Sequence, residues 1–332
     1  MDINKPRIGW IDMAKGYGIL FIIIGHFYIP IITPLLYTFH VPLFFFLSGY
    51  VVNMNIGFRS FFYHKIKKIL FPYFFLSIPI IVSNIVFEYK DSFTINNLQT
   101  EISYFIIQKR HTTMWFLSSL FFLNVLLYPI VKKINADKQF LVVVSIAIIG
   151  LVLWRVGITV LPWNCDISFV ALPFIFLGYK MRTKYKNTLI TINKWYNAIF
   201  LIIATLLMGL ANYVYTGSRI DLYYSKFTIE PLAYLNAFTG ISAVIIFSQK
   251  TNIRFVRYLG QNSLLYFAWH QSIVFPVIGK VYQAINISQA NFLPNEIWMF
   301  ITSVLLVILT IFIITILNEL IMRSKMSFIL GK

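Results

Sequence analysis

The 332-residue chain contains 59% hydrophobic and 18% aromatic residues but only 12% charged ones, a composition that excludes a soluble domain and indicates a membrane protein. Its net charge of +17 lies in short basic clusters between apolar runs, as the positive-inside rule produces, so we expect no nucleic-acid partner. The single cysteine, Cys165, excludes an internal disulfide framework and a thiolate metal site.

Ten apolar runs are long enough to cross a membrane as helices. The predicted spans are residues 13–32, 37–55, 69–87, 114–131, 139–157, 166–180, 195–214, 231–248, 263–282 and 297–319. The first run has no small-residue cleavage site and is followed at once by the second, so it is predicted to be a retained span and not a signal peptide. The sequence therefore predicts an all-α polytopic membrane protein, a bundle of about ten transmembrane helices forming one domain over residues 1–332, with no separate soluble domain.

The basic residues predict the orientation of these spans. Of the 28 lysines and arginines, 21 fall before or within the first span, in alternate loops and after the last span. Because cytoplasmic loops carry the excess of Lys and Arg, both termini are expected in the cytoplasm. The longest outside segment, 88–113, is too short for a globular domain. The bias toward Ile, Asn, Lys and Phe is typical of an AT-rich bacterial genome, so we expect a bacterial cytoplasmic membrane.

The first two spans carry ionisable side chains, which are costly in hydrocarbon and are functional-site candidates by default. Lys15 and His26 are eleven positions apart, about three helical turns and roughly 16 Å, so they lie on one helix face at different depths. Asp12 joins that face, and His40 follows in the second span. This pattern favours an enzyme that binds a charged carrier at the membrane surface and carries out proton chemistry deeper in the bundle.

Several stretches resemble motifs of the membrane-bound acyltransferase-3 family, in the family's order. They are Trp10-Ile-Asp12-Met-Ala-Lys15-Gly16 with Gly25-His26, Phe39-His40-Val-Pro42-Leu-Phe-Phe-Phe-Leu-Ser48-Gly49-Tyr50, Lys65-Ile-Lys67-Lys68-Ile-Leu-Phe-Pro72-Tyr73, Trp115-Phe-Leu, and Leu259-Gly-Gln-Asn262-Ser263-Leu-Leu-Tyr266 leading to His270. Within the family, the chain looks like the fucose 4-O-acetylase-like branch. Lysine stands at positions 15, 65 and 68, where many members have arginine; it keeps the charge but not the bidentate fork.

The resemblance implies transfer of an acyl group, usually acetyl from acetyl-CoA, to a hydroxyl of a cell-surface or exported carbohydrate. The polyanionic end of the donor would meet Lys15, Lys65 and Lys68 at the cytoplasmic surface, with Asp12 orienting Lys15. His26 would remove the acceptor proton as general base, because an unperturbed imidazole has a pKa near 6.5. His40 would help to orient the acceptor, and the resemblance further implies that Trp115 and His270 contact the donor.

Each histidine also has a structural interpretation. A buried histidine in a helical bundle can simply hydrogen-bond across helices, and His40 can satisfy a carbonyl freed by the proline two residues later. His270 lies about seven residues into its span from the cytoplasmic end, so we expect it to be too shallow to meet His26 easily. His64 and His111 fall in predicted loops and are expected to be solvated.

The basic and acidic candidates have simple alternatives as well. Positive-inside anchoring and anionic lipid headgroups, which are expected partners of any such protein, explain the basic segment 59–68 on their own. Asp12 can be no more than a favourable charge at a helix N-terminus. No spacing of three ligands predicts a metal site, so no metal is expected.

Two other function classes remain open on the sequence alone. A glycan transporter or flippase would also be polytopic and carry intramembrane polar residues, but we find no repeats or interrupted spans in matching halves. A non-catalytic membrane scaffold of a glycan-assembly complex is the second alternative. Neither accounts for Lys15 and His26 on one helix face. The sequence gives no indication of the oligomeric state.

Overall fold

The computed structural model describes residues 8–27, 29, 32–87, 89, 92–108, 110, 112–224, 226–227, 229–286 and 295–331. Its α-helices are α1 (Gly9–His26), α2 (Ile32–Tyr37), α3 (His40–Val51), α4 (Phe58–Lys65), α5 (Phe71–Phe87), α6 (Ile95–Ile107), α7 (Trp115–Lys133), α8 (Gln139–Arg155), α9 (Cys165–Thr183), α10 (Lys186–Thr191), α11 (Trp195–Thr216), α12 (Glu230–Lys250), α13 (Arg254–Gln261), α14 (Ser263–Trp269), α15 (Phe275–Asn286) and α16 (Asn295–Arg323). Two π turns, η1 (Ile66–Leu70) and η3 (His270–Val274), and two 3-10 turns, η2 (Pro162–Asn164) and η4 (Lys325–Leu330), join some of them. Beyond the helices, the described residues contain an isolated β-bridge between Asp221 and Lys226.

The all-α prediction is confirmed, and each predicted span falls on helical structure. Within the described residues, six helical segments are both long and apolar enough to cross a membrane, which makes the chain a multi-pass membrane protein. They are Ile32–Val51, Phe58–Phe87, Trp115–Lys133, Trp195–Thr216, Glu230–Lys250 and Trp298–Arg323. The total of about ten crossings and the orientation of the termini stay predictions.

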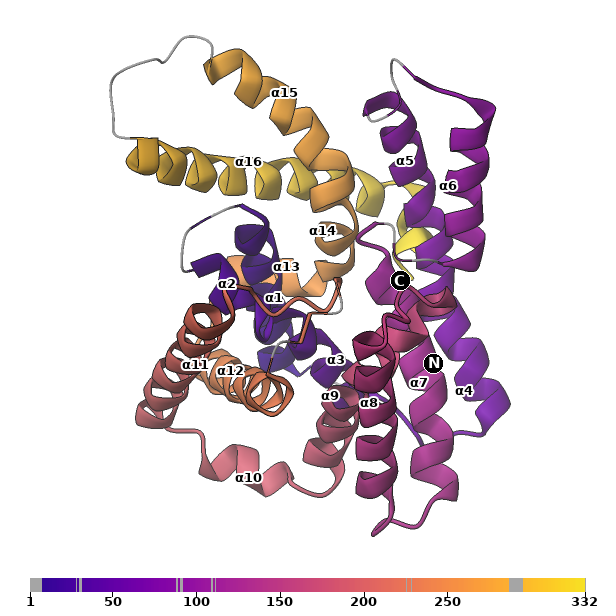
Figure 1. Ribbon diagram of the computed structural model, residues 1–332, viewed down its shortest axis with the longest axis vertical. Helices are drawn as coiled ribbons and strands as arrows, with labels where there is room; N and C mark the ends of the chain where they lie inside the picture. The colour runs from indigo at the N-terminus through magenta and orange to yellow at the C-terminus, as the bar shows by residue number, and fades with distance from the viewer. Residues whose placement is uncertain are drawn as a thin grey trace.

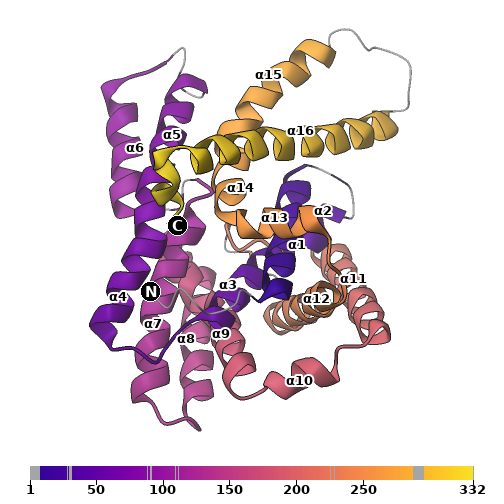
Figure 2. The same ribbon diagram turned by 180° about the vertical axis from the view of Figure 1, so that it is seen from behind.

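The helices surround a central group formed by α1, α3, α9 and α13 (Figures 1 and 2). Helix α1 packs along α13, α3 packs along α9, and α11 packs along α12. The α5–α6 and α7–α8 pairs lie on one side of this group in Figure 1, the α11–α12 pair lies on the other, and α14 to α16 extend above it. Segments from both ends of the chain therefore meet at α1.

Glycines allow the central helices to approach closely. A Cβ atom on Gly16 of α1 would lie 1.9 Å from the Val256 carbonyl oxygen of α13, and one on Gly260 of α13 would lie 1.7 Å from the Asp12 carbonyl oxygen. These distances are far below van der Waals contact, so only glycine fits at either position. Small residues at helix interfaces are a common way of packing membrane helices, because they let backbones touch.

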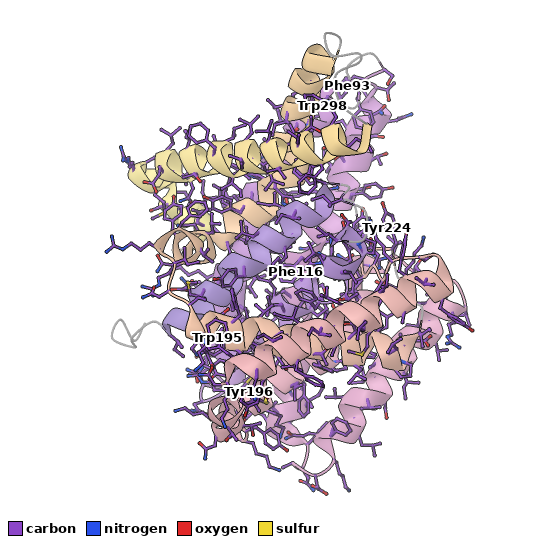
Figure 3. All side chains as sticks on the ribbon, turned by 90° about the vertical axis from the view of Figure 1, so that its left-hand side faces the viewer. Phe93, Phe116, Trp195, Tyr196, Tyr224 and Trp298 are labelled. Atoms are coloured by element: carbon purple, nitrogen blue, oxygen red, sulfur yellow. The ribbon has the colours of Figure 1, made fainter. Side chains whose placement is uncertain are left out.

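The outward faces of the peripheral helices are apolar, as a lipid-facing surface requires. On α11, Phe200, Leu207 and Val214 recur every seven residues and are 69%, 62% and 74% exposed. Figure 3 shows Trp195 and Tyr196 at the surface where α11 begins. Aromatic residues at the end of an apolar helix are typical of a membrane interface.

The segment 88–113, predicted to lie outside, contains the helix α6. Two local predictions are wrong. The basic segment 59–68 is not a loop but part of the helical run α4–η1–α5, so His64 is helical as well. Helix α1 ends at His26, several residues before the predicted end of the first span, because the chain turns there toward α2. His111 lies outside the described residues.

Candidate functional site

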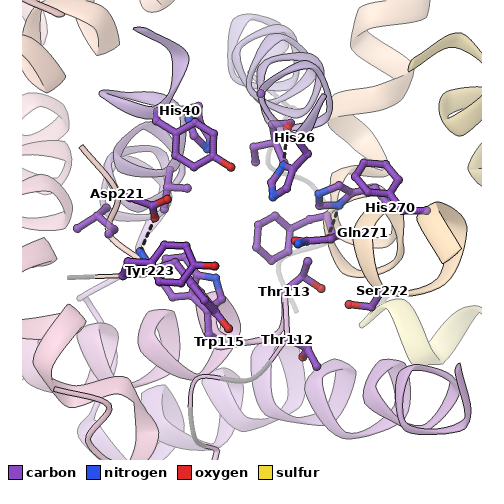
Figure 4. Close-up of a pocket in the computed structure, with 18 of the residues that line it drawn as sticks. His26, His40, Thr112, Thr113, Trp115, Asp221, Tyr223, His270, Gln271 and Ser272 are labelled. Atoms are coloured by element: carbon purple, nitrogen blue, oxygen red, sulfur yellow. Dashed lines mark hydrogen bonds between the residues drawn. The ribbon is translucent and has the colours of Figure 1, made fainter. Parts of the chain in front are cut away.

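The C-terminal end of α1 meets a cavity of about 560 Å³, which we call the histidine cavity because three histidines line it. His26 is the last residue of α1, His40 is the first residue of α3, and His270 is the first residue of η3. Figure 4 shows these side chains around one space. Residues far apart in the sequence thus build a single cluster of imidazoles.

The histidine rings are close neighbours. The ring centroids of His26 and His270 lie 4.8 Å apart in an edge-to-face arrangement. Tyr37 connects the third histidine to this pair, because its ring centroid lies 4.8 Å from that of His40 and 6.0 Å from that of His26. A small reacting group in the cavity can therefore meet more than one imidazole.

The same backbone contact orients all three rings. Nδ1 of His26, His40 and His270 lies 2.8, 2.5 and 2.9 Å, respectively, from the carbonyl oxygen four residues earlier. A carbonyl oxygen only accepts hydrogen bonds, so Nδ1 of each neutral ring carries the hydrogen and donates it. The lone pair of each ring then lies on Nε2, on the side of the ring away from its own helix backbone.

Burial makes one of these nitrogens unusual. His270 is fully buried, and among the described residues its Nε2 has no hydrogen-bond partner. A buried polar atom without a partner is costly, and such atoms in a folded protein call for a functional explanation. A hydroxyl of a bound substrate would supply the missing donor.

One predicted position is corrected by this geometry. His270 was expected to be too shallow to meet His26, because its span was predicted to begin at residue 263. Helix α13 begins nine residues earlier and already packs along the first half of α1, so the chain reaches the level of His26 by the time it arrives at His270. Trp115, the first residue of α7, lines the histidine cavity, and its contact with the donor stays a prediction.

A second cavity, of about 1080 Å³, lies at the other end of α1. The cations Lys15, Lys65 and Arg182 and the carboxylate of Asp12 line it, and we call it the basic cavity. Nε2 of Gln261 donates a hydrogen bond to Asp12 Oδ2 at 3.2 Å. Three cations against a single carboxylate in the described lining suit a large polyanionic ligand.

A third cavity, of about 190 Å³, borders the other two, and we call it the passage. It shares Lys15 and Ser263 with the basic cavity and Phe267 with the histidine cavity. The ring centroids of Phe116 and Phe267 lie 4.9 Å apart, and those of Phe44 and Phe116 lie 6.1 Å apart. Three aromatic rings thus line an apolar route from Lys15 toward His270.

Both π turns carry predicted site residues. Lys68 lies on η1, lines the passage and donates a hydrogen bond to the Gly331 carbonyl oxygen, whereas Lys67 on the same turn is exposed. His270 opens η3. A π turn adds a residue to a helix and rotates the side chains that follow, and such turns are frequent at functional sites. Lys65 and Lys68 thus line cavities whereas Lys67 does not, and the contact of Lys65 and Lys68 with the donor stays a prediction.

One wall of the histidine cavity contains charged residues that the sequence analysis missed. Arg219 and Asp221, from the connection between α11 and α12, form an ion pair with an N–O distance of 3.0 Å. The Arg219 guanidinium also lies 3.9 Å from the centroid of the Tyr37 ring. Burial raises the pKa of the Asp221 carboxyl above its usual range, and the nearby guanidinium opposes that shift.

These missed residues differ in how clearly the sequence indicated a role at the site. Arg219 and Asp221 stand out as opposite charges two positions apart in a loop predicted to lie outside, but their place beside His26 depends on how that loop folds back. Arg182 was counted as a topology signal, and its position on α9 beside the basic cavity was not foreseen. Phe267 gave no signal at all, because one more aromatic residue is inconspicuous in so apolar a chain.

Comparison with known proteins assigns the chain to a family. Residues 8–317 match the acyltransferase-3 family, which is described as an acyltransferase domain. Neither the curated proteins nor the solved structures yielded a match. The family match covers nearly the whole chain, including the histidine cavity, the passage and all of the described lining of the basic cavity except Leu330. The chain therefore belongs to the acyltransferase-3 family and is a membrane acyltransferase.

Proposed function

We propose that this membrane acyltransferase transfers acetyl from cytoplasmic acetyl-CoA to a hydroxyl of a cell-surface or exported carbohydrate, as in the fucose 4-O-acetylase-like branch that its motifs resemble. The observation that supports the proposal is the passage beside Phe267, which borders both a cavity lined by cations and a cavity lined by imidazoles. We expect the protein in a bacterial cytoplasmic membrane, with both termini in the cytoplasm.

The shape of the two cavities supports coenzyme A as the carrier of the acyl group. Coenzyme A has a bulky polyanionic end and a long, thin arm that ends in the thioester. The basic cavity offers Lys15, Lys65 and Arg182 to the phosphates, and Lys68 lines the passage beyond it. The arm would lie between the aromatic rings of the passage, and the thioester would emerge beside Phe267.

The histidine cavity supplies the chemistry for an acyl transfer. Nε2 of His26 takes the proton from the acceptor hydroxyl, and the resulting alkoxide oxygen attacks the thioester carbonyl carbon. The new C–O bond forms as the C–S bond breaks, and the departing thiolate takes the proton back from the His26 imidazolium. His40 and His270 act beside it, since both line the cavity and the buried Nε2 of His270 has no hydrogen-bond partner among the described residues.

The positions of the cavities also support donor and acceptor entering from opposite sides. The segments that the positive-inside rule places in the cytoplasm contribute Lys65 and Arg182 to the basic cavity. The connection between α11 and α12, expected outside, contributes Arg219 and Asp221 to the histidine cavity. Transfer would then move only the acyl group across the membrane, while the carrier stays inside.

Mass spectrometry of surface glycans tests the proposal. Cells that carry the wild-type protein should show acetyl esters on a carbohydrate, and cells that carry His26→Ala should lose them. The control is that the variant is still found in the membrane and still binds labelled acetyl-CoA in detergent. The same glycan acetylation in both strains would contradict the proposal.

A further inference from the structure

The charges that line the histidine cavity cancel. Arg219 and Asp221 are paired with each other, and the remaining described lining consists of neutral side chains when the histidines are neutral. Asp221 is 3% exposed. Taking Arg219 away would leave Asp221 as an unpaired charge in a poorly solvated wall, which is strongly unfavourable, whereas the Arg219 side chain is 36% exposed and can reach a bound sugar.

Aromatic faces surround this ion pair. Trp115, Tyr37 and Tyr223 all line the cavity, and the ring centroids of Trp115 and Tyr223 lie 6.1 Å apart. Figure 4 shows Trp115 and Tyr223 across the cavity from His26 and His270. The C–H faces of a pyranose ring are apolar and pack on aromatic rings, whereas its hydroxyls need polar partners such as Asp221 and Arg219.

A buried ion pair between Arg110 and Asp166, which we call the bracket, holds this wall of the cavity in place. Nη1 of Arg110 donates to the Tyr223 carbonyl oxygen at 2.5 Å, and Nη2 of Arg110 pairs with Asp166. The side chains of Arg110 and Asp166 are 4% and 0% exposed, so this is a desolvated ion pair and not a surface contact. The backbone N–H groups of Val160 and Leu161 also donate to Asp166, which ties a second loop to the bracket.

The backbone of these loops is strained. Among the described residues, the non-glycine residues with positive φ are Gln108, Val160, Trp163 and Asn164, all in the two loops beside the bracket. Nδ2 of Asn164 donates to the Gln108 carbonyl oxygen at 3.0 Å, so the loops support each other. Strained backbone persists where the surrounding structure holds it, and it clusters at binding sites.

We propose that this wall is the acceptor subsite and that it selects an uncharged sugar. The inference rests on the proposed function, since it names the class of carbohydrate that the same cavity accepts. A neutral pyranose can stack against Trp115 and Tyr223 and hydrogen-bond to Asp221 and Arg219 while their ion pair stays intact. The carboxylate of an acidic sugar would either lie close to the Asp221 carboxylate or compete with it for Arg219. Both arrangements are unfavourable, so the wall would reject an acidic sugar.

Matched acceptor pairs test this selectivity. In vesicles supplied with labelled acetyl-CoA, methyl hexosides should be acetylated with a kcat/KM at least about tenfold higher than the corresponding methyl hexuronosides, which differ by one carboxylate. Asp221→Asn leaves Arg219 without its anion, so it should lower transfer to the hexoside and raise the relative use of the hexuronoside at least about tenfold. Glu230→Gln is the matched control, because it removes a carboxylate from the Arg155 pair outside the cavity and should leave the ratio unchanged.

A second variant, which removes the opposite charge of the pair, keeps the inference testable if Asp221→Asn does not fold. Arg219→Gln leaves Asp221 as an unmatched anion, so the relative use of a methyl hexosaminide, which carries a positive charge, should rise over that of the hexoside. Equal or preferred use of the hexuronoside by the wild type, or unchanged ratios in the folded variants, would overturn the inference while leaving the proposed function intact. Failure of the wild type to acetylate any of these sugars would overturn both.

Discussion

Replacing His26 by glutamine separates proton transfer from packing. Glutamine keeps a hydrogen-bonding side chain at the end of α1, but it cannot take up the proton of an acceptor hydroxyl. If His26 only bridges helices, His26→Gln should remain largely active. If His26 is the general base, the variant should lose most of its rate while it still inserts, folds and binds the donor.

The neighbouring histidine sets the size of the expected loss. Removing a general base typically costs about 10²–10⁴-fold in rate, which corresponds to about 2.7–5.5 kcal/mol of transition-state stabilisation. The His270 ring lies 4.8 Å from His26, and its Nε2 has no partner among the described residues, so it can take over part of the role. We therefore expect a loss of about 10²–10³-fold for His26→Gln and a larger one, toward about 10⁴-fold, when His270→Gln is added.

A single-turnover assay measures this loss directly. Labelled acetyl-CoA is bound to purified protein in vesicles, the sugar acceptor is added, and the label on the sugar is followed with time. His40→Gln is the comparison, and we expect a smaller loss there because orienting an acceptor tolerates more error than moving its proton. Turnover of His26→Gln within about threefold of the wild type, with normal donor binding, would refute the reasoning.

Three further predictions concern the donor, the packing and the orientation. The double variant Lys65→Ala with Lys68→Ala should weaken acetyl-CoA binding in detergent and make the remaining affinity less sensitive to salt. The control Lys67→Ala should do neither. If Lys67→Ala had the same effect, the lysines would be topology signals and not donor ligands. Gly260→Ala should lower the unfolding temperature in detergent, because its Cβ would lie 1.7 Å from a backbone oxygen, and Gly57→Ala, with nothing within 4 Å, should have no such effect. An accessibility tag in the α9–α10 connection should report the cytoplasm and one in the α11–α12 connection the outside; the same side for both would contradict the topology.

Hydropathy predicted the helices well, because a membrane helix must satisfy its backbone internally and cover itself with apolar side chains. The same rule marked His26 and His40 as functional candidates, since ionisable residues are rare in apolar spans. The boundaries were less predictable. Helix α1 stops at His26 because of how the chain turns toward α2, which hydropathy does not report.

Contacts between distant segments could not be predicted from the sequence. The approach of His270 to His26 depends on how α13 packs along α1, and the two helix backbones approach most closely where glycine stands at position 260. The same holds for Arg219, whose place in the cavity depends on the fold of a loop. The sequence shows which charged and polar residues are unusual for a membrane helix. Only the packing of the helices and loops shows which of these residues come into contact.

The aromatic passage between the cavities has a consequence for membrane permeability. An open route between two cavities at opposite ends of α1 would let protons and ions leak along it and dissipate the gradients that the membrane maintains. Phe116 and Phe267, with ring centroids 4.9 Å apart, form a hydrophobic constriction of the kind that excludes water and hydrated ions. In the proposed mechanism, the arm of the donor parts these rings and fills the space as it enters, so an acyl group can cross where an ion cannot.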